Sequence, residues 1–495
     1  MPQTLAVPPR RRACAAAWIL MASLSLTGAA QAQSAGFTII GHIEAFTLAP
    51  PSDPFSAATM TVRNLAILLP RNLMITMPGS YATPQALFRG QPRSGLALAD
   101  PAANPALPRI PFEAEVIGNI TGGRYVAGVV RISQGALHIG AGFIQAIDEA
   151  RSELRIGDQG GTTGARVRLN DPKGIYGLSN GAPARAAVPL DDRFALDPDN
   201  SPVHARTGFP VCIPRAATDA NASKCPADNR PLDTALRRFT CSRRNAGQLG
   251  APAETNMAVV ECDPSRPVPL RVGDFVSYVG MLVADPAGGF LVAAHGLEAE
   301  LGVYTVPGTE PVYLFVEEAI QGTKGETFPG IPQEETTRFR IVGFTTDPSR
   351  NVVVQVFDGT AAADATPFTG PAGLPPSNGP QLGRFRNTWP AKDDARAVRR
   401  DVRVSVLGSA NATQPSTGLT SGRYEAPVSE YIYPEATRFG VPGFPLPVPF
   451  ESFCFLARGG MAVAGLTPGR LDPFPESGHP QSQRIGNGER RVCEP

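Results

Sequence analysis

Glycine and proline together occupy one position in five of this chain, with 51 of each among its 495 residues. Inside a helix a glycine costs about 1 kcal/mol relative to alanine and a proline costs about 3 kcal/mol, so this content argues against long helices. Disorder of the whole chain is also excluded, because 42% of the residues are hydrophobic and only 18% are charged. The composition therefore predicts a folded, mostly β chain with many turns, and the length predicts about two to four domains.

The first 32 residues have the features of a secretory signal peptide. Residues 10–12 are arginines, residues 13–26 are mostly apolar, and residues 30–32 read Ala-Gln-Ala, which fits the A-x-A cleavage pattern. No later stretch reaches 18 apolar residues, so we expect no membrane-spanning segment in the mature chain. The chain is predicted to be exported, to the periplasm or to the extracellular medium.

Six cysteines lie beyond this segment: Cys212, Cys225, Cys241, Cys262, Cys454 and Cys493. An even number of cysteines in an exported chain indicates disulfides, and six cysteines allow about 15 connectivities. The entropy of loop closure favours bonds within the central four and a bond between Cys454 and Cys493. No C-x2-C pair exists, and spacings of 13, 16 and 21 residues among the central four do not fit a zinc ribbon or finger, so no metal is expected.

Short β-branched and apolar runs separated by turns predict tandem small OB-like β-barrels or meanders joined by Pro/Gly-rich linkers. We expect an N-terminal β segment at 33–89, a linker at 90–111, a small β-barrel at 112–171, an irregular disulfide-stapled insertion at 172–268, a second β-barrel at 269–358, a linker at 359–399 and a β or irregular tail at 400–495. Two short helices are expected, one beginning at Pro84 with Thr83 as its N-cap and one near 232–238.

A weak internal repeat supports the barrels. Residues 116–127 read Val-Ile-Gly-Asn-Ile-Thr-Gly-Gly-Arg-Tyr-Val-Ala; Tyr-Val-Gly-Met-Leu at 278–282 is followed by Gly-Gly-Phe-Leu-Val-Ala at 288–293. Both segments fit a strand, a glycine kink, a strand, a Gly-Gly turn and a strand. A glycine inside a strand permits the sharp coiling of a small barrel, and a Gly-Gly pair supplies the positive φ angles of a hairpin turn.

Three further motifs carry a resemblance to other proteins. Gly-His-Ile-Glu lies at 41–44, Val-Gly-Asp-Phe-Val at 272–276 and Thr-Thr-Asp-Pro-Ser-Arg at 345–350. With the strand pattern, they resemble a group of exported, uncharacterised bacterial and fungal proteins with OB-like small β-barrels, over about residues 40–360. The resemblance implies the fold alone, with no activity and no catalytic residues.

Few residues form a pattern of known catalytic chemistry. Residues 177–181 match G-x-S-x-G with Ser179 as the nucleophile, but turns on both sides argue against the strand-to-helix elbow that this motif requires. His42 and Glu44 are two residues apart, so on a regular strand they would share one face. Residues 197–200, Asp-Pro-Asp-Asn, offer oxygens to calcium but lack the glycine and the glutamate of an EF-hand loop. His42, Glu44 and Ser179 are the candidates for catalysis.

The leading hypothesis is a binding or structural protein that is not an enzyme and uses no cofactor. OB-like barrels bind ligands on one sheet face and its flanking loops, which makes Tyr125 and Phe290 the candidate contact residues, with Trp389 in the second linker as a further stacking candidate. The ligand is unknown and a cell-envelope or extracellular polymer is one candidate, whereas a net charge of +1 predicts no nucleic acid partner. The alternative is a secreted hydrolase whose residues converge from distant strands.

Overall fold

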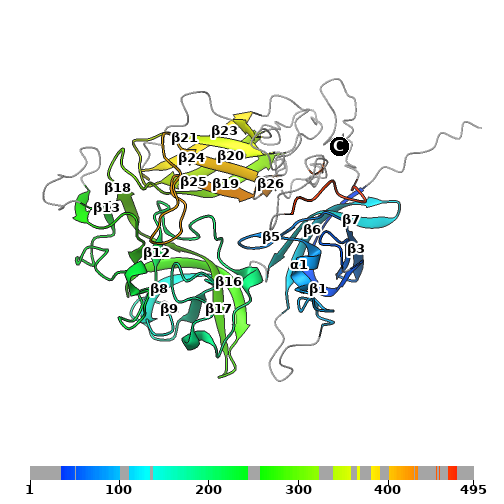
Figure 1. The fold of residues 1–495 in the computed structure, drawn as a ribbon, viewed down its shortest axis with the longest axis horizontal. Coiled ribbons are helices and arrows are strands. Elements are labelled where there is room, and N and C mark those ends of the chain that lie inside the picture. Colours follow the sequence, from blue (N-terminus) through cyan, green and yellow to red (C-terminus); the bar gives the residue numbers. More distant parts are fainter. Residues whose placement is uncertain are drawn as a thin grey trace, which may run out of the picture. The chain divides into compact units, whose positions relative to one another are not determined.

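The computed structural model describes residues 35–50, 52–100, 111–133, 138–243, 257–322, 338–357, 365–367, 381–390, 401–427, 430–432, 453, 456 and 466–475. Within these residues the chain is mostly β, with α1 (Pro84–Phe88) as the α-helix among them (Figure 1). The prediction of a mostly β chain built from small barrels is confirmed. The expected signal segment and the cysteines Cys454 and Cys493 lie outside the described residues.

The first barrel has five main strands: β1 (Ala35–Leu48), β2 (Ala58–Val62), β3 (Leu65–Leu69), β6 (Glu113–Thr121) and β7 (Arg124–Ser133). They pair in the order β3-β2-β1-β6-β7, and a parallel pairing between β3 and β7 closes the sheet. The short strands β4 (Ile75–Thr76) and β5 (Tyr81–Ala82) and helix α1 lie in the connection between β3 and β6. The Thr83 hydroxyl accepts the N–H of Ala86 and caps α1, as the sequence predicts.

The second barrel repeats this arrangement with β8 (Ile139–Asp148), β9 (Glu153–Gly157), β10 (Ala165–Leu169), β16 (Phe275–Ala284) and β17 (Phe290–Ala299). The order is β10-β9-β8-β16-β17, and a parallel pairing of β10 with β17 closes it. In both barrels the first strand lies between the second and the fourth, and the third runs parallel to the fifth. The chain therefore contains a tandem pair of five-stranded barrels.

A long insertion between β10 and β16 carries two disulfides, Cys212–Cys225 and Cys241–Cys262. Its strands are β11 (Val203–Ala205), which pairs with β17, β12 (Val211–Cys212), β13 (Arg238–Ser242), β14 (Ala258–Glu261) and β15 (Val268–Pro269). β12 pairs with β15, and β13 lies between β14 and β18 (Gly302–Thr305). The two bonds join neighbouring cysteines, which are the pairings that short loops favour.

The internal repeat of the sequence occupies equivalent hairpins of the two barrels. The register of β6 against β7 shifts at Gly118, and the register of β16 against β17 shifts at Gly280. A Cβ atom would lie 2.1 Å from the Val126 carbonyl oxygen at the first position and 2.5 Å from the Ala293 carbonyl oxygen at the second. Only glycine fits these two bulges, which bend the strands around each barrel.

The third part is a sandwich of two four-stranded sheets. One sheet has the order β23-β20-β19-β26, and the other has the order β22-β21-β24-β25. Their bounds are β19 (Leu314–Gly322), β20 (Arg338–Thr345), β21 (Val352–Phe357), β22 (Ala365–Pro367), β23 (Arg384–Pro390), β24 (Asp401–Val406), β25 (Arg423–Pro427) and β26 (Glu430–Ile432). Val316 and Ile341 of the first sheet and Val354 and Val404 of the second belong to one buried core.

The strand pairing differs from the boundaries that the sequence suggests. The expected barrel at 112–171 is divided, because β6 and β7 complete the first barrel whereas β8, β9 and β10 begin the second. The expected barrel at 269–358 is divided in the same way between the second barrel and the sandwich. Periodicity identifies strands, but the partner of a strand depends on contacts between residues far apart in the sequence.

The structure also differs from the prediction at two expected linkers and at one expected helix. Leu96 and Ala97 of the 90–111 segment are buried in the core of the first barrel, and β22 and β23 lie inside the 359–399 segment. Residues 232–237 form bends and turns, and Arg238 begins β13. Proline-rich chain can pack against a core without regular structure, which composition does not reveal. No helix in the described part of the chain has the length and apolarity needed to cross a membrane.

Candidate functional site

His42 and Glu44 lie on β1 but bind different partners. The Nδ1 atom of His42 is 3.7 Å from a carboxylate oxygen of Glu113, and the imidazole is half exposed. The register of β1 against β2 shifts at Glu44, whose two carboxylate oxygens accept the backbone N–H of Asn64 at 3.2 and 3.0 Å. The bulge interrupts the alternation on which a shared face depends. Glu44 thereby fastens the β2–β3 turn, where Asn64 has a positive φ of 61°.

Ser179 lies in a loop that leads into a short 3-10 helix at Pro183–Arg185, without a preceding strand. Its backbone carbonyl accepts the N–H of Ala182 at 3.0 Å. The neighbouring Asn180 organises this loop, since its Oδ1 accepts the Asp171 N–H and its Nδ2 donates to Asn170 and Asp192. The strand-to-helix elbow of a hydrolase nucleophile is not formed around Ser179.

Tyr125 and Phe290 lie near the start of the last strand of their barrels, Tyr125 as the second residue after a Gly-Gly turn and Phe290 as the first. The ring of Tyr125 meets the ring of Phe37 edge to face at 5.1 Å and packs against the first core. Phe290 is 43% exposed at the start of β17. Trp389 lies on β23 rather than in a linker.

The motifs at 41–44, 272–276 and 345–350, which carry the resemblance to other proteins, each contribute one carboxylate that binds a turn. Glu44 binds the β2–β3 turn, as described above. Asp274 accepts the N–H of Arg271 at 2.8 Å and binds two guanidinium groups of the insertion. Asp347 accepts the N–H of Gly308 at 2.8 Å and both the N–H and the hydroxyl of Ser349. These contacts give the motifs a structural role.

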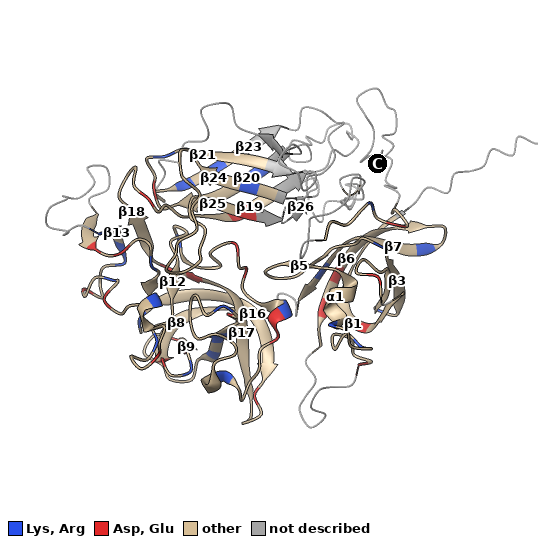
Figure 2. Ribbon diagram, in the orientation of Figure 1, with Lys and Arg blue, Asp and Glu red and all other residues tan. Residues whose placement is uncertain are grey.

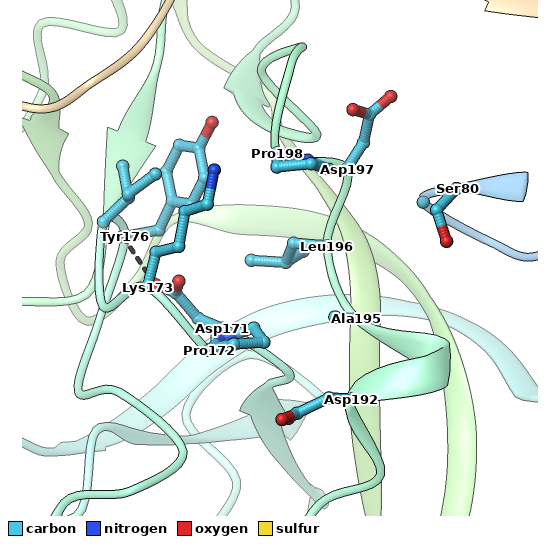
Figure 3. A pocket seen from close by; sticks show the side chains of 12 residues that line it. Ser80, Asp171, Pro172, Lys173, Tyr176, Asp192, Ala195, Leu196, Asp197 and Pro198 are labelled. Atoms are coloured by element: carbon cyan, nitrogen blue, oxygen red, sulfur yellow. Dashed lines mark hydrogen bonds between the residues drawn. The ribbon is translucent and has the colours of Figure 1, made fainter. Parts of the chain in front are cut away.

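A pocket of about 200 Å³ lies where loop 171–177 faces residues 192–198 and the β4–β5 turn (Figure 3). Its apolar lining consists of Gly79, Pro172, Ile175, Tyr176, Ala195, Leu196 and Pro198, and its polar lining consists of Ser80, Asp171, Lys173, Asp192 and Asp197. An apolar concave surface with a few polar groups is typical of a small-molecule site. The sequence motifs named above do not include this combination of residues.

The first wall is held from inside by Asp171 and Arg185. The buried Asp171 carboxylate accepts the N–H groups of Tyr176 and Gly177 at 2.7 and 3.1 Å, and burial raises the pKa of this carboxyl. The Arg185 guanidinium lies in the interior and donates to the carbonyl oxygens of Leu169 and Ser152. Burial lowers the pKa of Arg185 to about 10. The Asp171 carboxylate therefore fixes the conformation of loop 171–177, and Arg185 anchors Leu169 just before the loop.

The second wall is a segment, 191–200, that contacts all three parts of the chain. Arg193 donates to the carbonyl oxygens of Leu87 and Ser94 in the first barrel at 2.7 and 2.6 Å. Leu196 donates its N–H to Asn170, just after β10 of the second barrel. The Asn200 amide binds the backbone of Glu425 in the sandwich. These contacts make segment 191–200 a junction.

Residues 197–200 form a turn within this junction. The Asp197 carboxylate accepts the N–H groups of Asp199 and Asn200 at 2.8 and 3.2 Å, and burial raises the pKa of Asp197. Among the described residues no group of three or more His, Cys, Asp or Glu side chains is placed to hold a metal ion. The Asp197 carboxylate, one of the groups that suggested calcium in the sequence, is bound by the turn itself.

The pocket carries charged groups of both signs. In the described part of the chain, neither Lys173 nor the carboxylates of Asp171, Asp192 and Asp197 form an ion pair within 4 Å. Elsewhere arginines pair with acids across the strands, as Arg166 does with Glu153, and both signs of charge are spread over the strands and loops (Figure 2). The pocket is thus a place where charges remain available to a ligand.

Sequence reasoning missed Asp171, Lys173 and Tyr176 because Asp-Pro-Lys-Gly at 171–174 is an ordinary turn sequence. One signal was present, since Lys173 is one of only four lysines in a chain whose other basic residues are arginines. Lysine rarity alone does not define a site, and the second wall comes from residues twenty positions later. The pocket is recognisable only once the two loops are folded together.

Comparison of the chain with models of protein families, with curated proteins and with solved structures found no match. The resemblance to exported OB-like proteins stays a prediction.

Proposed function

We propose that this chain is an exported binding protein, without catalytic activity, and that its ligand site is the pocket between loop 171–177 and residues 192–198. The observation that supports this proposal is the combination of an apolar cavity with charged groups that no ion pair within the described chain neutralises. The loop that forms one wall is already ordered by the buried Asp171 carboxylate, which accepts two of the loop's N–H groups. A site that is formed before binding loses less conformational entropy when the ligand enters.

Two features of different kinds support an exported location. The sequence begins with a basic and then apolar segment that ends in an A-x-A pattern. The folded chain carries two disulfides, which persist in oxidising compartments. We propose the periplasm or the extracellular medium as the place where the protein works.

The size of the pocket limits the ligand. Sites for drug-sized molecules commonly measure about 300–1,000 Å³, and this pocket has about 200 Å³. The ligand is therefore a small molecule, or the end group of a cell-envelope or extracellular polymer. Tandem barrels serve here as the scaffold that presents the two loops, in keeping with the position of binding loops on small barrels.

Thermal unfolding of the mature protein with a panel of small sugars, amines, carboxylic acids and amino acids tests this proposal. A ligand that binds the folded state raises Tm in a concentration-dependent way. The variant Ser80→Trp places a large ring at the pocket and should abolish the shift, whereas Ser52→Trp in the exposed β1–β2 loop should retain it. If no compound raises Tm, or if both variants respond alike, the proposed site is wrong.

Hydrolysis of ester, glycoside and peptide substrates should be measured on the same preparation. Turnover that disappears in His42→Ala, Glu44→Gln or Ser179→Ala, with an unchanged Tm, would support the hydrolase alternative and contradict a purely binding function.

A further inference from the structure

We infer that the pocket binds a small zwitterion, that is, a molecule with one ammonium group and one carboxylate on an apolar body, such as a free α-amino acid. This inference rests on the proposed binding function and names the class of ligand for the same site.

The carboxylates of the pocket differ in their remaining capacity to bind a ligand. The Asp171 carboxylate is buried and accepts two backbone N–H groups. Both oxygens of Asp197 accept hydrogen bonds within the 197–200 turn, from backbone N–H groups and from the Asn200 amide. Asp192 is exposed and accepts one hydrogen bond, at Oδ1, from Asn180. Asp192 is therefore the carboxylate with the most capacity for an incoming ammonium.

Lys173 is the positively charged residue of the pocket. Its ammonium lies on the wall of the same pocket and forms no ion pair with any described residue. In the view of Figure 3 Lys173 and Asp192 lie toward opposite ends of the pocket, and Leu196 lies between the two. One wall thus offers a positive charge to a carboxylate, and the other offers a negative charge to an ammonium.

A ligand with a single charge leaves one of these two groups without a partner. A plain cation would satisfy Asp192 but not Lys173, and a plain anion would satisfy Lys173 but not Asp192. Covering a charge without giving it a partner is unfavourable, because the charge loses its hydration. A zwitterion supplies a partner to both groups, and each charge-assisted hydrogen bond is about twice as strong as a neutral one.

The volume and the apolar lining of the pocket limit the size of the ligand's body. A cavity of about 200 Å³ suits an amino acid with a small apolar side chain. Ile175, Leu196 and Pro198 would contact that side chain. Gly79 of the first barrel lies close to the 195–197 backbone, where a Cβ atom would lie 2.5 Å from the Ala195 carbonyl oxygen.

Three probes with the same isobutyl group separate the contributions of charge: L-leucine carries both charges, 3-methylbutylamine carries only the ammonium, and 4-methylpentanoate carries only the carboxylate. The alanine series (L-alanine, ethylamine and propionate) repeats the comparison with a smaller body. Isothermal titration calorimetry on the mature protein should show that one of the two amino acids binds at least tenfold more tightly than both of its analogues.

Substitutions assign the two charges. Lys173→Gln should weaken amino acid binding at least tenfold and leave the amine unchanged or more tightly bound. Asp192→Asn should weaken the amino acid and the amine at least tenfold and leave the carboxylic acid unchanged. Lys224→Gln and Asp228→Asn make the same changes of charge outside the pocket and should alter no affinity.

Each failure has a distinct meaning. If the amine or the acid binds as tightly as the amino acid, or if Lys173→Gln has no effect, the zwitterion inference is wrong. If none of the six probes binds but another compound of the thermal panel gives a Tm shift that Ser80→Trp abolishes, the inference fails and the binding function stands. If nothing binds, the binding function fails as well.

Discussion

The guanidinium of Arg230 and the carboxylate of Asp274 form two parallel hydrogen bonds, of 2.6 and 2.8 Å, and both side chains are shielded from solvent. Arg230 lies in the disulfide-bearing insertion, and Asp274 lies directly before β16 of the second barrel. The same carboxylate accepts the Arg271 N–H and binds the Arg237 guanidinium. One aspartate thus attaches the insertion to the barrel.

Replacing Asp274 by alanine should strongly destabilise the protein. Arg230 would remain buried without its counter-charge, and the free energy of unfolding should fall by about 3–5 kcal/mol, as when one partner of a buried pair is removed. Urea denaturation followed by fluorescence measures the change. Glu300→Ala breaks the exposed pair with Arg206 and should cost less than about 1 kcal/mol. Equal effects of the two substitutions would contradict the role of burial.

The bulge glycines give a second prediction. Gly118→Ala and Gly280→Ala place a methyl group against backbone carbonyl oxygens at 2.1 and 2.5 Å, and the strand must shift to relieve the contact. Each variant should lose at least about 1–3 kcal/mol of stability. Gly181→Ala adds the same methyl group where no heavy atom lies within 4 Å, and it should leave Tm unchanged within about 1 °C or raise it slightly. Normal stability of Gly118→Ala would argue against the bulge geometry.

The disulfide pairing is open to a chemical test. Peptide mapping of the unreduced protein should recover Cys212 linked to Cys225 and Cys241 linked to Cys262. All four cysteines are buried, so reductant should act slowly until the protein unfolds. The double variant Cys241→Ala/Cys262→Ala should lose about 2–5 kcal/mol of stability. A peptide linking Cys225 to Cys241 would contradict this pairing.

The sequence allowed the type of fold to be predicted because local rules decide it. The glycine repeat located two hairpins that are indeed equivalent, and the Thr83-Pro84 start of α1 follows from capping and from the preset φ of proline. Strand partnership was not predictable in this way. β6 joins β1 although about 65 residues separate them, and the hydrophobic pattern of β6 would be the same in any barrel.

The pocket could not be predicted for a related reason. Lys173 and Asp192 belong to separate loops, and each reads as an ordinary solvent-exposed turn residue. Their shared environment arises from the buried contacts of Asp171 and Arg185 beneath one loop and of Arg193 beneath the other. Buried polar contacts between loops leave no periodic signal in a sequence.

We expect the buried His204 to make the folded protein less stable in acid. It is buried on β11, its ring lies 4.0 Å from that of Phe315, and burial lowers its pKa to about 4. As the pH falls below 6.5 the unfolded chain binds a proton that the folded chain excludes, so stability is full above pH 6.5 and decreases toward pH 4. The loss attributable to His204 is about 3 kcal/mol.

His204→Phe should remove this part of the pH dependence. Phenylalanine retains a flat ring beside Phe315, and the Ala205 carbonyl that His204 contacts keeps its hydrogen bond from the Gly208 N–H. Urea denaturation at pH 8 and pH 4.5 should show parent and variant with similar stabilities at the higher pH and the variant more stable than the parent at the lower one. The same decrease in both proteins would show that His204 is not the group responsible.

Asn200 connects the pocket to the sandwich through hydrogen bonds. Its amide Nδ2 donates to the Glu425 carbonyl and its Oδ1 accepts the Glu425 N–H at 2.9 Å, so the side chain covers the outer edge of β25, the last strand of its sheet in the described chain. Its own carbonyl oxygen accepts the hydroxyl of Tyr176, which lines the pocket. A ligand that restricts the motion of Tyr176 should therefore also reduce the local opening of β25.

Hydrogen exchange of the Glu425 amide measures this connection. Asn200→Ala removes two hydrogen bonds to the Glu425 backbone, worth about 1 kcal/mol each, besides the bond to Asp197, so exchange at Glu425 should accelerate by roughly 30-fold. The Val404 amide, on the neighbouring strand of the same sheet, provides the reference and should change little. Ligand should slow exchange at Glu425 in the parent protein but not in Tyr176→Phe, because that variant lacks the hydroxyl that reaches Asn200. Equal slowing in both proteins would mean that the pocket reaches β25 by another route.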